Sequence, residues 1–150
     1  MYCSDVSYLH TRNIHLRIHV YGGTYDKISF SMHYCYRFLI LSIPILIVEW
    51  IIGKFNPYKK DTSSLHLIQS VFRFILWLTG VEVTVIGEEL VPTDEAVLYI
   101  GNHRSFFDIL LTYTRCPRLT GYIAKAEMEK IPLLSNWMHY LHCLFLDRKD

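Results

Sequence analysis

The spacing of hydrophobic and polar residues divides the chain into three parts. Residues 1–31 are polar, rich in Tyr and His, and show no sustained period. Met32 opens a very different segment, so we expect 1–31 to be an atypical extension in front of a true start at Met32. Residues 32–80 contain long apolar runs that favour helices. From residue 81 to 150, short β-prone segments alternate with helical ones.

The middle part predicts a membrane-associated helical hairpin. Residues 38–52 read FLILSIPILIVEWII, which is shorter than the run of about 20 residues that crosses a bilayer. A buried core helix fits this run less well, because β-branched and aromatic residues surround the whole cylinder. A turn at 53–57 leads to a second helix at 65–78 with one apolar stripe. We therefore expect a hairpin that dips into one leaflet, with basic and aromatic residues at its edges.

The last part predicts the first half of an α/β domain. Strands are expected at 81–87, 96–101, 121–125 and 142–147, and helices at 105–114 and 131–141. This order favours a parallel or mixed sheet that is covered by helices.

A histidine and a carboxylate stand where one of these strands passes into a helix. The segment reads Asn102-His103-Arg104-Ser105-Phe106-Phe107-Asp108. The carboxyl ends of strands in open α/β sheets are the usual place for chemistry. A neutral imidazole that is oriented by a carboxylate can act as a general base there. The alternative is structural, because Ser105 and Asp108 also have the spacing of a helix-capping box.

The same spacing occurs a second time, at His142 and Asp147. This copy lies in a segment that is expected to be a strand, where an odd separation sends two side chains to opposite faces. The pair is therefore not expected to meet. The turn into a helix, and not the spacing, makes the first copy a candidate for catalysis.

Composition excludes several other classes of function. The net charge of +1 does not favour nucleic-acid binding. Four scattered cysteines without a C-x-x-C pair suggest neither a disulfide framework nor a zinc knuckle. No Gly-rich phosphate loop and no G-x-S-x-G elbow occurs in the sequence. The mean hydropathy of +0.20 agrees with contact to a membrane.

The sequence disfavours two further kinds of chemistry. A metal site could draw on His139, His142, Cys143 and Asp147, but a helix and an alternating strand do not direct them at one ion. We therefore expect no metal. Ser105 could be a hydrolase nucleophile, but its place at a helix start already accounts for it.

Several motifs together resemble the lysophospholipid acyltransferase superfamily, and specifically bacterial 1-acyl-sn-glycerol-3-phosphate acyltransferases. The N-H-x-x-x-x-D motif is met by Asn102, His103 and Asp108. A K-x-E-x-x-x-x-P region followed by F-[IL]-D-R is met by residues 125–132 and 145–148. The helical pair in front also looks like the membrane-facing helices of this family. The resemblance covers about residues 32–150.

The resemblance implies a reaction, its substrates and a location. A fatty acyl group would pass from acyl-CoA or acyl-carrier protein to the free hydroxyl of lysophosphatidic acid. His103 would be the general base and Asp108 its orienting acid. Asn102, Arg104, Lys125 and Arg148 would bind the substrate. No bound cofactor is implied, and the partner surface would be the cytoplasmic face of a bacterial inner membrane.

The sequence also departs from the family pattern. The E-G-[TS]-R motif and the Pro-containing strand that usually follow are not found before residue 150. We therefore expect a C-terminally truncated sequence. The alternative to an active acyltransferase is a catalytically inactive, membrane-bound fragment.

Overall fold

The computed structural model describes the backbone of residues 2–10, 12–21, 25–80, 82–92, 96–101 and 106–147. The chain forms two compact units, each made of two stretches of sequence. Unit 1 comprises Met1–Ile28 and Phe72–Pro117, and unit 2 comprises Ser29–Val71 and Arg118–Asp150.

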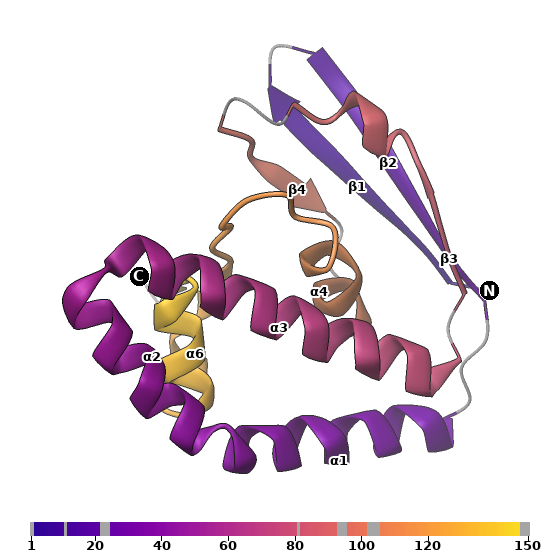
Figure 1. Ribbon diagram of the computed structural model, residues 1–150. Coiled ribbons are helices and arrows are strands. Elements are labelled where there is room, and N and C mark those ends of the chain that lie inside the picture. The colour runs from indigo at the N-terminus through magenta and orange to yellow at the C-terminus, as the bar shows by residue number, and fades with distance from the viewer. Residues whose placement is uncertain are drawn as a thin grey trace. The chain divides into compact units, whose positions relative to one another are not determined.

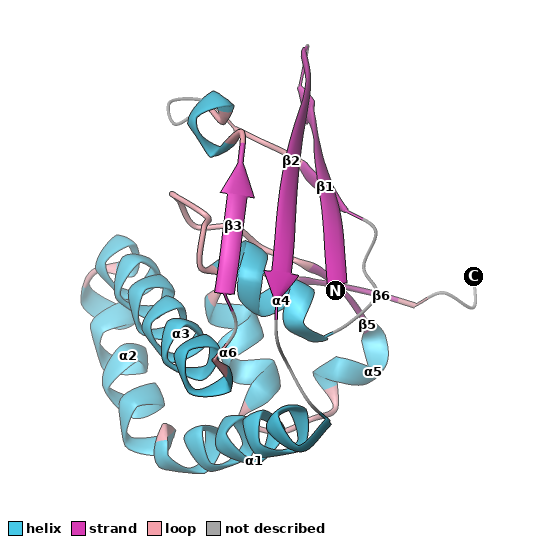
Figure 2. Ribbon diagram, turned by 90° about the vertical axis from the view of Figure 1, so that its right-hand side faces the viewer, coloured by secondary structure: helices cyan, strands magenta, loops and turns pink. Residues whose placement is uncertain are grey.

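Unit 1 contains a four-stranded antiparallel sheet (Figure 2). Its strands are β1 (Tyr2–His10), β2 (Arg12–Tyr21), β3 (Glu82–Ile86) and β4 (Tyr99–Gly101). The spatial order is β3-β2-β1-β4, so a hairpin from the start of the chain occupies the centre. In the register, Arg17 stands opposite Ile86, and Val6 stands opposite Gly101.

This sheet corrects one expectation. The strands predicted at 81–87 and 96–101 are present as β3 and β4, and β4 is shorter than expected. They pair with the hairpin β1–β2, for which the pattern had predicted no element, and all three pairings are antiparallel. An antiparallel hairpin needs only a short turn, whereas a parallel pair needs a long crossover. Neighbouring segments at the start of the chain could therefore form the centre of this sheet.

The interior of unit 1 is formed by helix α4 and the last turns of helix α3. Helix α4 (Phe106–Tyr113) buries Leu110, Leu111 and Tyr113 almost completely. The ring of Tyr113 meets Phe72 edge to face, with the ring centroids 6.0 Å apart. Burial of such side chains is worth roughly 1.5–3 kcal/mol each. The 3-10 helix η1 (Glu88–Leu90) lies between β3 and β4 in the sequence.

Three helices open unit 2 (Figure 1). They are α1 (Tyr25–Leu41), α2 (Ile43–Phe55) and α3 (Pro57–Thr79). The first residues of α1 and the last turns of α3 belong to unit 1. The helix predicted over 38–52 is thus divided between α1 and α2 at Ser42. Proline in the first turn of α2 explains the break, because Pro44 has no N–H and its ring opposes a continuous helix. The Ser42 hydroxyl donates to the Leu39 carbonyl over 2.8 Å.

No single helix within the described residues has both the length and the apolarity of a membrane span. The segments His33–Leu41 and Ile43–Phe55 reach these limits only as a pair, and the pair is bent by 53°.

The remainder of unit 2 is a small parallel sheet with two short helices. The elements are β5 (Ile123–Lys125), α5 (Ala126–Glu129), α6 (Leu134–Tyr140) and β6 (Leu144–Leu146). Strands β5 and β6 pair in parallel. A side chain at Gly121 would collide with the His142 carbonyl, since an added Cβ would lie 2.1 Å from it. Glycine therefore allows the two segments to approach each other.

Helix α6 is attached to the bend between α1 and α2. Trp137 is buried and donates from Nε1 to the Ser42 hydroxyl over 2.9 Å, and its ring also lies against Phe38. The Tyr140 hydroxyl donates to the Leu46 carbonyl over 3.3 Å. These contacts join residues that are more than 90 positions apart, so the helical hairpin and the segment after residue 118 form one folded unit.

The α/β class that the sequence predicted is confirmed, and so are a helical hairpin and a parallel strand pair. The expected arrangement of all strands in one parallel or mixed sheet is wrong for the described residues. Only β5 and β6 are parallel, while β3 and β4 belong to the antiparallel sheet of unit 1.

Candidate active site

The first H-x-x-x-x-D stretch lies between β4 and α4. Strand β4 ends at Gly101 and helix α4 begins at Phe106, so the predicted strand-to-helix passage is confirmed. Asn102, His103, Arg104 and Ser105 lie outside the described residues. The contact between His103 and Asp108 therefore stays a prediction.

Asp108 is the acidic residue in the first turn of α4, and only 7 % of it is exposed. Its neighbours Leu110 and Leu111 on the same helix are buried in the core of unit 1. A carboxylate is stabilised at a helix N-terminus by the helix dipole, but its burial is costly without polar partners. The Thr112 hydroxyl donates to the backbone carbonyl of Asp108 over 2.7 Å. This hydrogen bond lies within α4 and leaves the Asp108 carboxylate unaffected. The position of Asp108 suits an acid that orients another group and is shielded from water.

Tyr99 on β4 and Glu88 in η1 are titratable residues of unit 1 that precede the candidate pair. Burial, together with the neighbouring Cys116 and Glu88, raises the pKa of Tyr99 on β4 to about 12. Its phenol is therefore neutral at physiological pH. Glu88 is held by Arg115, with 3.2 Å between Oε2 and Nη1, at an exposed position. Exposed ion pairs of this kind contribute little to stability.

Lys125 stands at the end of β5 and directly before α5. It is exposed, has extended backbone angles (φ −70°, ψ 144°) and pairs in register with Leu146 of β6. In a parallel pair the carboxyl ends of both strands lie at one edge of the sheet. The backbone after Leu146 therefore leaves the sheet beside Lys125. Arg148, the second residue of this region that is expected to bind the substrate, lies outside the described residues.

The second H-x-x-x-x-D stretch has a different arrangement from the expected one. His142 does not belong to β6, because it lies in the preceding turn with a positive φ of 55°. Its Nε2 atom lies 3.0 Å from the Oδ2 atom of Asp61 on α3. Desolvation alone would raise the pKa of Asp61, but the hydrogen bonds from Lys60 and His142 outweigh it and lower that pKa. His142 therefore serves a contact within unit 2.

Metal and thiol chemistry find no support in the part of the chain that the structure describes. No group of three or more His, Cys, Asp or Glu side chains there is arranged to hold a metal ion. Of the residues weighed for such a site, His139 lies 3.5 Å from Glu129 and His142 is paired with Asp61. Burial raises the pKa of the Cys35 thiol to about 11 and also raises that of Cys143, so neither is a thiolate at neutral pH.

One buried acidic residue was not singled out from the sequence. Glu49 is 3 % exposed in the apolar helix α2, and its Oε1 atom accepts a hydrogen bond of 2.6 Å from the Ser63 hydroxyl on α3. The sequence did contain a signal for this contact. Glu49 is a single carboxylate within an apolar run, and hydroxyl residues that could donate to it follow on the next helix. The contact joins the two arms of the hairpin.

Comparison with known proteins finds similarity to acyltransferases, in agreement with the motifs. The profile of the Acyltransferase family matches residues 82–150. A probable 1-acyl-sn-glycerol-3-phosphate acyltransferase of Mycoplasma pneumoniae is 26 % identical over 136 residues, covering 79 % of this chain and 51 % of the relative. A 1-acyl-sn-glycerol-3-phosphate acyltransferase of Chlamydomonas reinhardtii is 28 % identical over 129 residues, covering 83 % of this chain and 38 % of the relative.

A relative with a different acceptor in its name also matches. Lysophosphatidylcholine acyltransferase 1 of Rattus norvegicus is 30 % identical over 104 residues, covering 63 % of this chain and 19 % of the relative. The chain thus spans about half or less of the length of these relatives. No solved structure matches the chain. The matched region begins at β3, contains both H-x-x-x-x-D stretches and extends to residue 150, so residues 82–150 are similar to the Acyltransferase family.

Proposed function

We propose that the protein containing this chain transfers a fatty acyl group from a thioester to the free hydroxyl of 1-acyl-glycerol-3-phosphate, which yields phosphatidic acid. The observation that carries this proposal is the family match over 82–150, with its N-H-x-x-x-x-D motif at the passage from β4 to α4. The acceptor is taken from the names of relatives that cover most of the chain.

In the proposed reaction, His103 removes the proton of the acceptor hydroxyl while that oxygen attacks the thioester carbonyl. The C–O bond forms, the C–S bond breaks, and the proton passes to the leaving thiol. Asp108 orients the imidazole and stabilises its protonated form, as the acid does in a Ser-His-Asp triad. Support comes from the 7 % exposure of Asp108, since a shielded carboxylate acts more strongly on a partner than one in water. No acyl-enzyme is needed, because the substrate hydroxyl is the nucleophile.

The phosphate of the acceptor needs fixed cations or donors, and we assign it to Asn102, Arg104, Lys125 and Arg148. Lys125 is the one of these residues whose position is described, at the end of β5, and it is exposed and available to a substrate. A lysine acts on phosphate as a compact point charge, whereas an arginine can bind two oxygens at once. Donors are acyl-CoA or acyl-carrier protein, and no bound cofactor enters the reaction.

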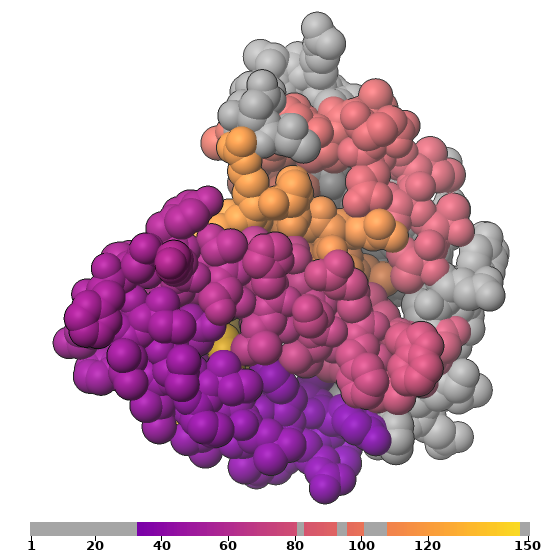
Figure 3. Space-filling view, viewed as in Figure 1, coloured from indigo at the N-terminus to yellow at the C-terminus, as the bar shows by residue number. Residues whose placement is uncertain are grey.

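We also propose that α1 and α2 attach the protein to a bilayer surface. Atoms of these helices lie at the surface of the face drawn in Figure 3. The helices expose large apolar residues, with Leu41 72 % exposed and Phe55 87 % exposed. Such surfaces are rare on soluble monomers and mark a site of contact. A lipid acceptor and a lipid product could then stay in the membrane during turnover. By resemblance, the membrane is the cytoplasmic face of a bacterial inner membrane.

The acceptor can be tested directly, because two relatives carry different acceptors in their names. Purified protein containing this chain is supplied with radiolabelled acyl-CoA or acyl-carrier protein, and with either 1-acyl-glycerol-3-phosphate or lysophosphatidylcholine. We expect labelled phosphatidic acid as the main product. Labelled phosphatidylcholine in its place would move the assignment to the second acceptor, and no labelled lipid from either acceptor would refute acyl transfer to lysophospholipids.

A further inference from the structure

Helix α6 carries an indole whose hydrogen-bond partner lies on the helical hairpin. Trp137 and Ser42 are both buried, and the Trp137 Nε1 atom donates to the Ser42 hydroxyl over 2.9 Å. The Ser42 hydroxyl in turn donates to the Leu39 carbonyl over 2.8 Å. A buried indole N–H requires an acceptor, and a satisfied buried polar contact favours one arrangement over its neighbours. The pair therefore selects one place for α6 along the hairpin.

Further contacts hold the other end of α6 on the same hairpin. The Tyr140 hydroxyl donates to the Leu46 carbonyl on α2 over 3.3 Å, and the Lys60 Nζ atom on α3 lies 4.9 Å from the centroid of the Tyr140 ring. Directly after the helix, His142 pairs with Asp61 on α3. Helix α6 thus contacts the hairpin from the α1–α2 bend to the first turns of α3.

A short series of backbone hydrogen bonds connects α6 with β5. The Cys143 N–H donates to the Met138 carbonyl of α6 over 2.9 Å. The next residue, Leu144, opens β6 and donates from its N–H to the Tyr122 carbonyl over 2.8 Å. Tyr122 directly precedes β5, which pairs with β6. A shift of α6 on the hairpin would therefore be passed to both strands.

These strands hold Lys125, which the proposed function assigns to the acceptor phosphate. Lys125 is the last residue of β5, is exposed, and stands opposite Leu146 of β6 in the register. Its ammonium acts on a phosphate as a point charge, and such an attraction weakens with distance. The strength of phosphate binding at Lys125 therefore depends on where the two strands lie.

We propose that Trp137 and Ser42 are positioning residues for the acceptor. Their hydrogen bond seats α6 on the α1–α2 bend, α6 sets the place of β5 and β6, and these strands hold Lys125 where the phosphate binds. Both residues act through Lys125 and not by contact with the substrate. This inference rests on the proposed function, from which it takes the phosphate ligand. It makes the hairpin a scaffold of the substrate-binding edge as well as a membrane attachment.

The test measures the KM for 1-acyl-glycerol-3-phosphate at saturating acyl-CoA in the whole protein. Ser42→Ala removes the acceptor of the indole N–H, and Trp137→Phe removes its donor. We expect each variant to raise this KM about two- to tenfold, the usual effect of one hydrogen bond, and to keep kcat close to the wild-type value. Unfolding of part of the protein would lower kcat and leave KM unchanged, so loss of stability alone gives the opposite pattern.

A double-mutant cycle shows whether the effect passes through Lys125. Lys125→Gln alone should raise the KM for the acceptor about 10- to 100-fold, because it removes a charged donor to the phosphate. In this background Ser42→Ala should raise the KM no further, because the ammonium whose position it sets is absent. Amide hydrogen exchange without substrate should be faster at residues 123–125 and 144–146 in Ser42→Ala than in the wild type.

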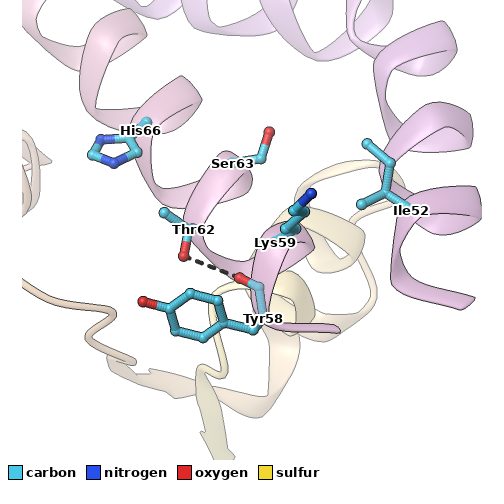
Figure 4. A pocket seen from close by; sticks show the side chains of 6 residues that line it. All are labelled: Ile52, Tyr58, Lys59, Thr62, Ser63 and His66. Carbon is cyan, nitrogen blue, oxygen red and sulfur yellow. Dashed lines mark hydrogen bonds between the residues drawn. The ribbon is translucent and has the colours of Figure 1, made fainter. Parts of the chain in front are cut away.

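Two variants serve as matched controls. Thr62→Val also removes a hydroxyl from the hairpin, but the Thr62 hydroxyl donates to the Tyr58 carbonyl over 3.0 Å within α3, and Thr62 lines a hollow of the surface (Figure 4). Trp77→Phe also replaces an indole, at an exposed position. Both variants should keep the wild-type KM and the wild-type hydrogen exchange of β5 and β6.

Three results would overturn the proposal. Rises in KM that multiply fully in the Ser42→Ala, Lys125→Gln double variant would show that the hydrogen bond does not act through Lys125. Wild-type KM and hydrogen exchange in both Ser42→Ala and Trp137→Phe would show that the contact positions nothing. A wild-type KM in Lys125→Gln would remove the phosphate ligand and the positioning role with it. In each case the wild type still forms phosphatidic acid, whereas a wild type that forms none would refute the proposed function itself.

Discussion

Asp108 and Asp147 complete the same H-x-x-x-x-D spacing in two different surroundings. Asp108 lies in the first turn of α4, 7 % exposed, beside the buried core of unit 1. Asp147 follows the short strand β6 and is exposed. The histidine of the second copy is committed to Asp61, at 3.0 Å. The same spacing thus ends once at a buried carboxylate and once at an exposed one, and we expect only the buried one to take part in acyl transfer.

The largest expected effect comes from replacing each of the two carboxylates in turn. Asp108→Asn should lower the rate of acyl transfer by about 10²–10⁴-fold, because the imidazole of His103 would lose the carboxylate that orients it and stabilises its protonated form. Asp147→Asn is the control and should stay close to the wild-type rate. The rates are measured as phosphatidic acid formed with saturating donor and acceptor. Equal losses in both variants would remove the distinction between the two copies.

The second effect concerns the packing around each copy. Leu110→Ala, at a position with no exposed surface, should lower the free energy of unfolding by about 2–5 kcal/mol through lost burial and a cavity. Leu144→Ala, where the side chain is 65 % exposed, should change it by less than about 1 kcal/mol. Urea unfolding with equal slopes for both variants measures the difference. A similar loss at both positions would mean that the first copy is not the better packed one.

The third effect concerns the contact that joins α6, the helix before the second H-x-x-x-x-D stretch, to the bend between α1 and α2. Trp137→Phe removes the Nε1 donor to Ser42 and one ring of a buried indole, and should cost about 1–3 kcal/mol. Trp77→Phe is the matched control, since Trp77 is 71 % exposed. Thermal unfolding of the two variants compares them. If both melt as the wild type does, the contact between α6 and the α1–α2 bend contributes nothing to stability.

The smallest effect is the dependence of the His142–Asp61 contact on pH. The pKa of Asp61 lies below its ordinary value of 3.8, so its contribution to stability is present above that value. The contribution is lost as the pH falls through the lowered pKa. Asp61→Asn should therefore melt below the wild type at neutral pH, and the two should converge in strong acid. A difference that stays constant down to the lowest pH would contradict this role for the Asp61 carboxylate.

The sequence alone predicted much of the region around α4 and β6. The apolar run before residue 101 and the S-x-x-D pattern at 105–108 correctly predicted where β4 ends and α4 begins. These signals are local, because strand propensity and helix caps act over a few residues. The break between α1 and α2 was also visible in Pro44, although the run 38–52 was interpreted as one helix.

The four-stranded sheet could not be predicted in the same way. Residues 13–20 alternate polar and apolar side chains, which was the overlooked signal for β2. The pairing of β2 with β3 joins residues that are more than 60 positions apart, for example Arg17 and Ile86. Local propensity does not specify such a partner. The contact of His142 with Asp61, 81 positions apart, escaped prediction for the same reason.

The most direct test of the account replaces each of the two histidines by glutamine in a separate variant. His103→Gln and His142→Gln are prepared in the protein that contains this chain, and phosphatidic acid formation from acyl-CoA and 1-acyl-glycerol-3-phosphate is measured for each. The account predicts a loss of about 10²–10⁴-fold for His103→Gln and a nearly unchanged rate for His142→Gln. A His103→Gln protein that is folded and retains the wild-type rate would contradict it.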